Sequence, residues 1–477
     1  MTESLNLQRR PDAEPVLWAF THGRGAWRVT LKSDSEPQAC VPDRWIPHVT
    51  PAGISYETTV FATNFSAAPA SIELVPYLEN GIRLPSVSLE VNPGATRIAS
   101  SGDLFSNQPV SHFGICGSFS VSVTAAYRST AASSTSAHVP EVTQRGTEFL
   151  FYPGEWNVVY EGMAVINLGA EASRVKAVLL NQTGEELRLT VLSPALAPYA
   201  KQLAVLDWEF RGLQGAVIRI ESSQPSAILF LRGTHPEAST ALLYYILPAL
   251  PGATGIPAPG LCNPERWILH LTPQDSGYET TILATNRQTS DVALEIVPLQ
   301  DDRTRLDSIF WTIAAGHSLI APASGLFAGT PISHFGLCGS ATTRVTAAYR
   351  SLLAPSASAH SPETSVTDNR FLFYPGEWPV VYEGMAVVNR GTNPEWVDAV
   401  LLDAQGYEVR RVRLIDRLAP RAKHLAVLDG IFSDFAGVAI RIECSEPSSV
   451  LLLRGTKPGH RPGVLFQTVP IAITPRR

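Results

Sequence analysis

The sequence predicts an all-β chain of tandem immunoglobulin-like β-sandwiches, arranged as two duplicated halves of two modules each. Two observations lead to this prediction: a gap-free internal repeat, and many short strand-like runs separated by turn residues. The 37 prolines and 34 glycines are spread along the 477 residues, between runs rich in Val, Ile, Leu, Thr and Tyr. Such regular punctuation is typical of short strands joined by turns, and it leaves little room for long helices.

The repeat relates positions that lie 222 residues apart, without a gap. The matched pairs include His48 with His270, Tyr56 with Tyr278, His112 with His334, Trp156 with Trp378, and Arg232 with Arg454. Residues 149–156 and 158–165 recur unchanged as residues 371–378 and 380–387. Because turn residues persist together with apolar ones, we expect the two halves to share loop geometry as well as core.

A weaker symmetry divides each half into two modules. Residues 56–64 resemble 160–167, and residues 125–130 resemble 229–234. We therefore expect four β-sandwiches, with these boundaries: module 1, residues 40–145; module 2, 146–250; module 3, 251–367; module 4, 368–477. An N-terminal extension, residues 1–39, stands outside the repeat. Its two expected strands, 16–20 and 26–32, would cap the first sandwich or pair with the edge of a neighbouring molecule.

Within each module, apolar and polar residues largely alternate, as in residues 71–77, which predicts strands with one buried and one wet face. An asparagine stands where one of these strands must turn, at Asn64, Asn167, Asn286 and Asn389. Asparagine suits such positions because it bonds nearby backbone and tolerates a left-handed conformation. About seven short strands per module, with turns every 8 to 12 residues, favour the immunoglobulin-like class.

The string from Arg44 to Asn64, followed by glycine turns and a closing Ala-Tyr-Arg at residues 126–128, resembles a β-sandwich module. That module is repeated in many uncharacterised bacterial surface and secreted proteins. The resemblance covers most of the chain beyond residue 40 and rests on turn and core positions. It implies a binding or structural role and supplies no catalytic residue to carry over.

The composition limits the classes of partner that the chain can bind. Charged residues make up 17% of the chain and the net charge is −6, so the chain lacks the excess positive charge with which proteins bind nucleic acid. No uninterrupted apolar run is long enough to span a membrane, and residues 241–261, broken by prolines, are expected to form a linker. The N-terminus lacks the apolar stretch of a secretory signal, so the sequence leaves the compartment open.

Four of the five cysteines obey the repeat, Cys40 with Cys262 and Cys116 with Cys338, whereas Cys444 replaces Ser222. The simplest interpretation is one disulfide in each half, Cys40 to Cys116 and Cys262 to Cys338, which would indicate an oxidising compartment. The alternative is paired buried thiols.

The histidines add a second alternative, a tetrahedral zinc site in each half. Its ligands would be Cys40, His48, His112 and Cys116 in the first half, and Cys262, His270, His334 and Cys338 in the second. The spacing lacks the close cysteine pair of a zinc knuckle, so packed structural histidines explain the pattern better, and we expect neither metal nor cofactor. His138 and His360 lie in Ser/Ala-rich stretches, residues 129–138 and 351–361, which we expect to be exposed loops.

An aromatic and acidic cluster surrounds each Tyr-Pro-Gly turn. Its candidate ligand-contact residues are Tyr152, Glu155, Trp156 and Tyr160, with the copies Tyr374, Glu377, Trp378 and Tyr382. Glu155 with Glu161 has the residue types of a glycosidase pair, although such pairs need a set separation across a cleft. The same residues equally suit carbohydrate stacking or packing between modules.

No nucleophile with its base, phosphate loop or clear metal motif emerges, because adjacent Ser111 and His112 would point to opposite faces of a strand. We therefore expect a non-enzymatic structural or adhesive protein of a bacterial surface or extracellular assembly. Its partners would be other proteins or further copies of itself in a filament. The alternative is a carbohydrate-binding protein that uses the repeated aromatic turns.

Overall fold

The structure is a computed structural model, and it is all-β. It describes residues 2–10, 13–21, 25–30, 40–51, 53–130, 134–235, 241–245, 262–273, 275–340, 342–353, 356–460, 463–469 and 471–472. The chain divides into two compact units, residues 1–43 and residues 44–477. The expected linker after residue 245, and with it the boundary between modules 2 and 3, lies outside the described residues.

The N-terminal unit is an antiparallel sheet in the order β1-β2-β3. Its strands are β1 (Thr2–Arg10), β2 (Ala13–Thr21) and β3 (Gly25–Thr30). The sequence led us to expect only the last two. β1 escaped notice because its sequence, TESLNLQRR, is mostly polar and resembles a solvated tail.

Module 1 is made of two four-stranded sheets, β4-β9-β6-β7 and β12-β10-β5-β8. The strands are β4 (Arg44–Ile46), β5 (Tyr56–Asn64), β6 (Ala70–Tyr77), β7 (Val87–Val91), β8 (Thr96–Ser100), β9 (His112–Gly117), β10 (Val121–Ser129) and β12 (Ala137–Pro140). A short helix, α1 (Ser101–Leu104), follows β8. Apolar residues of both sheets, such as Leu74, Phe113 and Val123, are fully buried, as two facing sheets require.

Module 3 repeats this arrangement with sheets β20-β25-β22-β23 and β24-β21-β26-β28. Its strands are β20 (Arg266–Ile268), β21 (Tyr278–Thr285), β22 (Val292–Leu299), β23 (Ile309–Ile313), β24 (Ser318–Pro322), β25 (His334–Gly339), β26 (Arg344–Ser351) and β28 (Ala359–Pro362). Helix α3 (Ala323–Leu326) occupies the place of α1. The 222-residue repeat is therefore kept at the level of strand pairing.

Modules 2 and 4 follow the same strand pairing, but one long strand joins the paired strands into a single sheet, of eight strands around module 2 and of nine around module 4. Module 2 contains β13 (Gly146–Phe151), β14 (Val159–Asn167), β15 (Ser173–Leu180), β16 (Glu186–Leu196), β17 (Lys201–Val205), α2 (Leu206–Glu209), β18 (Val217–Thr234) and β19 (Ala241–Tyr245). The first part of β18 pairs with β13 and β15, and the last part pairs with β14 and β19. The segment at 241–245, expected to belong to the linker, is thus a strand.

Module 4 repeats module 2. Its elements are β29 (Asp368–Phe373), β30 (Val381–Asn389), β31 (Glu395–Leu402), β32 (Glu408–Leu418), β33 (Lys423–Val427), α4 (Asp429–Phe432), β34 (Ala439–Thr456), β35 (Gly463–Thr468) and β36 (Ile471–Ala472). The first part of the long β34 pairs with β29 and β31, and its last part pairs with β30 and β35, within one sheet.

The strand order differs from that of a constant-type immunoglobulin domain, in which the first strand pairs with the second and the last pairs with the sixth. In module 1 the first strand, β4, pairs with β9, and β10 pairs with the second strand, β5. The central pairs, β5 with β8 and β6 with β9, match the immunoglobulin pattern. Strand pattern alone could not reveal this difference, because both orders bury the same alternating residues.

The Ser/Ala-rich stretches are not the exposed loops that their composition indicated. Their described residues include β11 (Ser134–Thr135) and the start of β12 in the first half, and β27 (Ser356–Ala357) and most of β28 in the second. β11 pairs in parallel with β19, and β27 pairs in parallel with β35. Small residues suit these strands because they lie between modules, where backbones approach closely.

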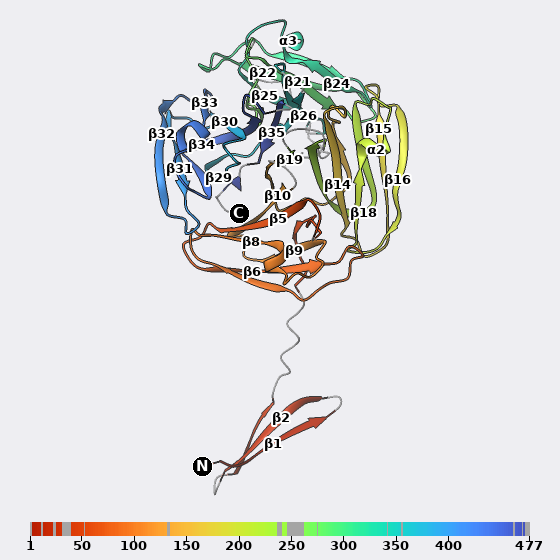
Figure 1. Ribbon diagram of the computed structural model, residues 1–477, viewed down its shortest axis with the longest axis vertical. Coiled ribbons are helices and arrows are strands. Elements are labelled where there is room, and N and C mark those ends of the chain that lie inside the picture. The colour runs from red at the N-terminus through yellow and green to blue at the C-terminus, as the bar shows by residue number, and fades with distance from the viewer. Residues whose placement is uncertain are drawn as a thin grey trace. The chain divides into compact units, whose positions relative to one another are not determined.

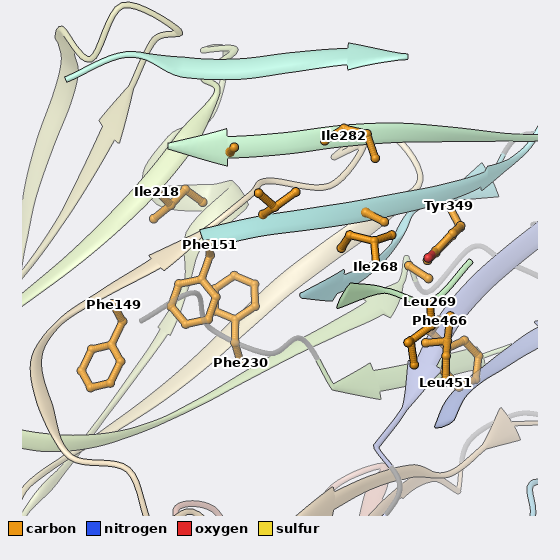
Figure 2. Packing of buried hydrophobic residues seen from close by; sticks show 14 of the residues in the cluster. Phe149, Phe151, Ile218, Phe230, Ile268, Leu269, Ile282, Tyr349, Leu451 and Phe466 are labelled. Atoms are coloured by element: carbon orange, nitrogen blue, oxygen red, sulfur yellow. The ribbon is translucent and has the colours of Figure 1, made fainter. Parts of the chain in front are cut away.

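The hydrophobic cores merge across module boundaries. One continuous cluster runs from Phe149, Phe151 and Phe230 of module 2 through module 3 to Phe466 of module 4. Figure 2 shows Phe151 and Phe230 stacked against each other, with ring centres 4.1 Å apart. The module 1 core likewise takes in residues of module 2. The modules of residues 44–477 are therefore packed parts of one body.

Four hydroxyl contacts join successive modules and close a ring. They link Tyr56 to Tyr160 (2.9 Å), Tyr152 to Thr285 (3.3 Å), Tyr278 to Tyr382 (2.8 Å) and Tyr374 to Thr63 (2.6 Å). The last contact joins module 4 to module 1. Within residues 44–477, Figure 1 shows the modules following one another around this ring. Each contact has a counterpart in the other half, so the ring has approximate twofold symmetry.

Candidate functional site

Two buried ion pairs hold neighbouring modules together. Arg232 is fully buried and donates from Nε to Glu161 Oε1 at 2.7 Å. Its other nitrogens donate to the carbonyls of Tyr152 (2.8 Å) and Ser358 (3.0 Å), the second of which belongs to module 3. We call this pair the arginine clamp. Its copy, Arg454 with Glu383, bonds the carbonyls of Tyr374 and of Ser136 in module 1.

The clamp also fixes the tryptophan of the aromatic turn. Glu161 accepts hydrogen bonds from the Trp156 indole Nε1 (2.6 Å) and from the Gly154 backbone N–H (2.8 Å). With its carboxylate buried and occupied in this way, Glu161 is not available to a substrate. The hypothetical glycosidase pair of Glu155 and Glu161 therefore does not form.

Glu155 and Glu377 bind arginines of the next module. Glu155 pairs with Arg350 and Glu377 pairs with Arg128, each at 2.9 Å from the arginine Nε. Burial raises the pKa of Glu155, and the charge of Arg350 opposes that rise. By the weaker internal repeat, Arg128 corresponds to Arg232, so equivalent arginines serve module contacts in all four modules.

Tyr152 and Tyr374 are buried where two modules meet. Tyr152 is 4% exposed, and burial raises its pKa to about 12. Tyr374 is equally buried and packs against Phe61 of module 1, with ring centres 4.5 Å apart. These two ligand-contact candidates are thus packing residues, because they occupy the seams where modules meet.

Trp156 and Tyr160, in contrast, line a surface hollow of about 600 Å³ in module 2. The other lining residues are Val205, Asp207, Trp208, Arg211, Gly212 and His235. Trp208 is 71% exposed, an unusual state for so large an aromatic side chain. The hollow therefore combines aromatic faces with an acidic, a basic and an imidazole side chain.

The walls of the hollow are held in place by bonds behind them. The Asp207 carboxylate accepts the backbone N–H of Glu161 at 2.8 Å, and the His235 Nε2 lies 2.8 Å from the carbonyl of Trp156. The Trp156 ring stacks on Phe210, with centres 6.5 Å apart. These contacts orient the lining groups before any ligand arrives, which reduces the entropy lost on binding.

The copy of this site in module 4 keeps only part of the set. Trp378 and Tyr382 remain, and Trp378 Nε1 donates to Glu383 at 2.7 Å. The positions of Trp208, Arg211, Gly212 and His235 are taken by Gly430, Ser433, Asp434 and Lys457. The Lys457 ammonium pairs with Asp429 at 2.9 Å. The two aromatic turns therefore share their buried contacts but differ in the residues that surround them at the surface.

The histidines of the zinc alternative lie at module seams. His48 Nδ1 is 3.1 Å from the buried Lys201 ammonium of module 2, and His112 Nε2 is 2.9 Å from the Tyr199 carbonyl. Burial, with the nearby Lys201 charge, lowers the pKa of each histidine to about 3. His270, His334 and Lys423 repeat this arrangement between modules 3 and 4, where Asp301 joins Lys423 at 3.1 Å.

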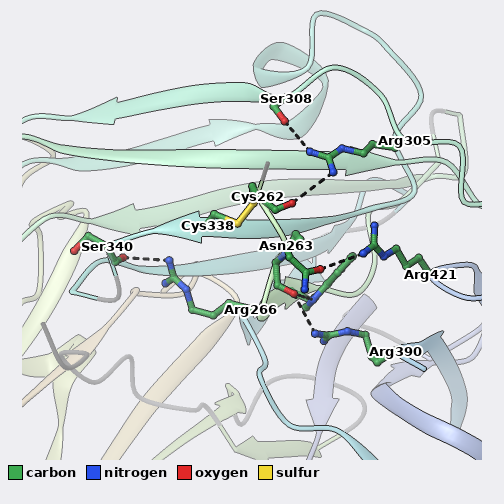
Figure 3. Close-up of a disulfide and its surroundings, with 11 residues drawn as sticks. Cys262, Asn263, Arg266, Arg305, Ser308, Cys338, Ser340, Arg390 and Arg421 are labelled. Atoms are coloured by element: carbon green, nitrogen blue, oxygen red, sulfur yellow. Dashed lines mark hydrogen bonds between the residues drawn. A yellow bond between two sulfur atoms is a disulfide. The ribbon is translucent and has the colours of Figure 1, made fainter. Parts of the chain in front are cut away.

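The cysteines are bonded in the pairs that the repeat indicated. Figure 3 shows the disulfide between Cys262 and Cys338. Cys40 and Cys116 are also disulfide-bonded, and Cys444 is the free, buried cysteine. Disulfide sulfurs offer no thiolate to zinc, and the described part of the chain contains no cluster of three metal-ligating side chains. The zinc alternative is therefore wrong for this structure.

His138 and His360, expected in solvated loops, face neighbouring modules. His138 contacts Tyr374 edge-on, with ring centres 5.8 Å apart, and His360 meets Tyr152 in the same way. Burial lowers the pKa of both imidazoles. Their Nδ1 atoms are buried without a hydrogen-bond partner, which disfavours protonation at this position.

Trp208, Arg211 and His235 were missed because the repeat points to residues that both halves retain, whereas Asp207, which is retained as Asp429, belongs to no recognisable motif. Divergence between the two halves was the signal that could have found Trp208 and Arg211, because their copies differ in residue type. The comparisons add no relative, because neither a known protein family nor a curated protein matches the chain. None of the helices in the described residues is long and apolar enough to cross a membrane.

Proposed function

We propose that this chain is a non-catalytic structural or adhesive protein, in which the sandwiches form a rigid ring that serves an extracellular or cell-surface assembly. The observation that carries the proposal is the use of the repeated polar residues. Arg232, Glu155, Lys201 and their copies bond adjacent modules, so the duplication preserves residues that fix module geometry. A ring closed in this way resists bending, a property suited to a scaffold.

Two further points support this setting. The disulfides suit an oxidising compartment, which favours an extracellular or surface location. The resemblance to repeated sandwich modules of bacterial surface and secreted proteins points the same way. We further propose that each module is a relative of the immunoglobulin sandwich with altered strand pairing, represented in module 1 by β4 paired with β9 and β10 paired with β5.

Self-assembly is the partner interaction that we propose, with the N-terminal sheet as the connecting element. A sheet of about 30 residues is smaller than the domains that are usually stable on their own, so pairing with a second copy would stabilise it. Electron microscopy and sedimentation of the full chain at high concentration test this idea, with a variant lacking residues 1–39 as the control. Filaments or oligomers of the full chain alone are expected; monomers in both samples would refute self-assembly.

Carbohydrate binding is the second candidate function, and a specific feature favours it. Trp156 and Tyr160 border a hollow that also presents the exposed indole of Trp208. Aromatic faces stack on the apolar faces of sugar rings, and nearby polar groups bond their hydroxyls. A glycan array probed with the intact protein tests this function, and an array without signal would refute it.

A further inference from the structure

The hollow beside Trp208 carries a charge pattern that selects among ligands. Asp207 and Arg211 bring one negative and one positive charge to its wall, together with the imidazole of His235. An anion would be attracted by Arg211 but repelled by Asp207, and a cation the reverse, so neither gains a net electrostatic attraction from this pair. A neutral ligand with hydroxyl groups can instead donate to the carboxylate and accept from the guanidinium. The chemistry of the wall therefore favours an uncharged polyhydroxyl ligand.

The space beside Trp208 is larger than a single sugar ring. A second hollow of about 500 Å³ shares Val205 and Trp208 with the first. It is lined mainly by apolar residues of module 2, including Leu203, Leu229 and Leu231, and its polar lining residues are Glu209 and, from module 1, His48. Trp208 thus borders both hollows and can offer its indole to a ligand that spans them. Volumes of this size hold ligands larger than one hexose ring.

We propose that module 2, but not module 4, binds a neutral oligosaccharide, with one sugar ring stacked on Trp208 and its hydroxyls bonded by Asp207 and Arg211. This inference rests on the carbohydrate-binding function proposed above and assigns it to one site. The asymmetry is its main support, since module 4 has Gly430 and Ser433 where module 2 has Trp208 and Arg211.

The internal copy provides the matched variants. Trp208→Gly and Arg211→Ser each give module 2 the residue that module 4 already carries. Gly430→Trp is the reverse change, and the space beside Gly430 is open, with no heavy atom within 4 Å of an added Cβ. Tyr407→Ala is the control, because Tyr407 is 72% exposed in module 4, in a turn distant in sequence from every lining residue. Circular dichroism and thermal melting establish that each variant is folded.

The full chain is first applied to an array of neutral oligosaccharides, built from hexoses and N-acetylhexosamines, and of acidic ones, carrying uronate, sialate or sulfate. Titration calorimetry with the strongest neutral hit then compares the variants. Loss of one stacking contact should weaken binding at least about tenfold in Trp208→Gly. Arg211→Ser should also weaken binding, whereas Tyr407→Ala should bind as the parent does.

The outcomes separate the two proposals. Binding of a neutral glycan that survives both Trp208→Gly and Arg211→Ser would overturn the assigned site and leave carbohydrate binding in place. Binding of acidic glycans alone would overturn the neutral class. An array without any hit would remove the carbohydrate function and this inference together. New or stronger binding in the double variant Gly430→Trp, Ser433→Arg would support the site from the other side.

Discussion

Removing the charge of Glu161 should destabilise the ring through the arginine clamp. In Glu161→Gln, the fully buried Arg232 loses its counterion while its charge remains. Breaking a buried ion pair from one side costs about 3–5 kcal/mol, because the remaining charge is left desolvated. Removing both charged groups should not restore stability, since Trp156 Nε1 and the Ser358 carbonyl would then lose their partners.

The shift in melting temperature depends on how much of the chain unfolds together. The entropy of unfolding is about 2.1 cal/mol/K per residue. For a unit of about 430 residues this amounts to roughly 0.9 kcal/mol/K, so a loss of 3–5 kcal/mol lowers Tm by about 3–6 °C. If module 2 instead unfolds alone, as about 100 residues, the same loss lowers its Tm by roughly 14–24 °C.

Differential scanning calorimetry of the parent, Glu161→Gln and the matched Glu383→Gln distinguishes these cases. Because the cores merge and the modules close a ring, we expect one transition and the smaller shift in both variants. A separate early transition would show that module 2 melts independently of the ring. A shift below about 1 °C in both variants would refute the reasoning on the clamp itself.

Three further predictions concern turns, disulfides and acid. Gly406→Ala should cost roughly 1–3 kcal/mol, because Gly406 has a φ of +83° and an added Cβ would collide with a backbone carbonyl of module 1. Gly459→Ala, at a φ of +96° with open space around it, should cost only the conformational part; equal losses in urea denaturation would contradict the close approach. Replacing Cys262 and Cys338 by serine should lose roughly 4 kcal/mol, because the bond closes a loop with a sequence separation of 76. Denaturation with and without reductant checks this, and reductant-independent stability of the parent would count against it. Acid should destabilise the protein, because the pKa of His112 is about 3 in the folded chain and about 6.5 when it is unfolded. The unfolded state binds more protons between these values, so this contribution to stability is complete above about pH 6.5 and is lost as the pH falls towards 3. Urea midpoints that stay constant or increase as the pH is lowered from 6.5 to 3 would contradict the burial.

Local pattern predicted much of what depends on neighbouring residues. Asn64, at the end of β5, bonds the carbonyls of Ala68 and Val91, in keeping with the turn role expected of the repeated asparagines. The polar strand β1 and the small-residue strand β12 were missed. Their strand character comes from pairing with other segments, and their own residues carry little hydrophobic alternation. The pairing of β4 with β9 and of β10 with β5 could not be predicted either, because the alternation of apolar and polar residues in β4 and β10 suits either sheet.

The site was predicted only in part, for a related reason. Trp156 and Tyr160 were selected for their residue types, and both reach the hollow. Tyr152 was selected on the same ground, but it is buried against Thr285 of the next module. Whether an aromatic side chain meets solvent or another module depends on how two modules pack together, and their packing angle leaves no periodic pattern in the sequence.

The duplication and the strand-and-turn character of the modules could be read from the sequence, because both follow from residue type and spacing. The sequence left the state of the cysteines open, and the bonds are seen in the structure. The closure of the ring, the contacts of Arg232 and Glu155 at its seams and the exposure of Trp208 beside Trp156 depend on tertiary packing. These features join residues tens to hundreds of positions apart. Their contacts arise from the relative orientation of whole modules, which the pattern within any one strand does not encode.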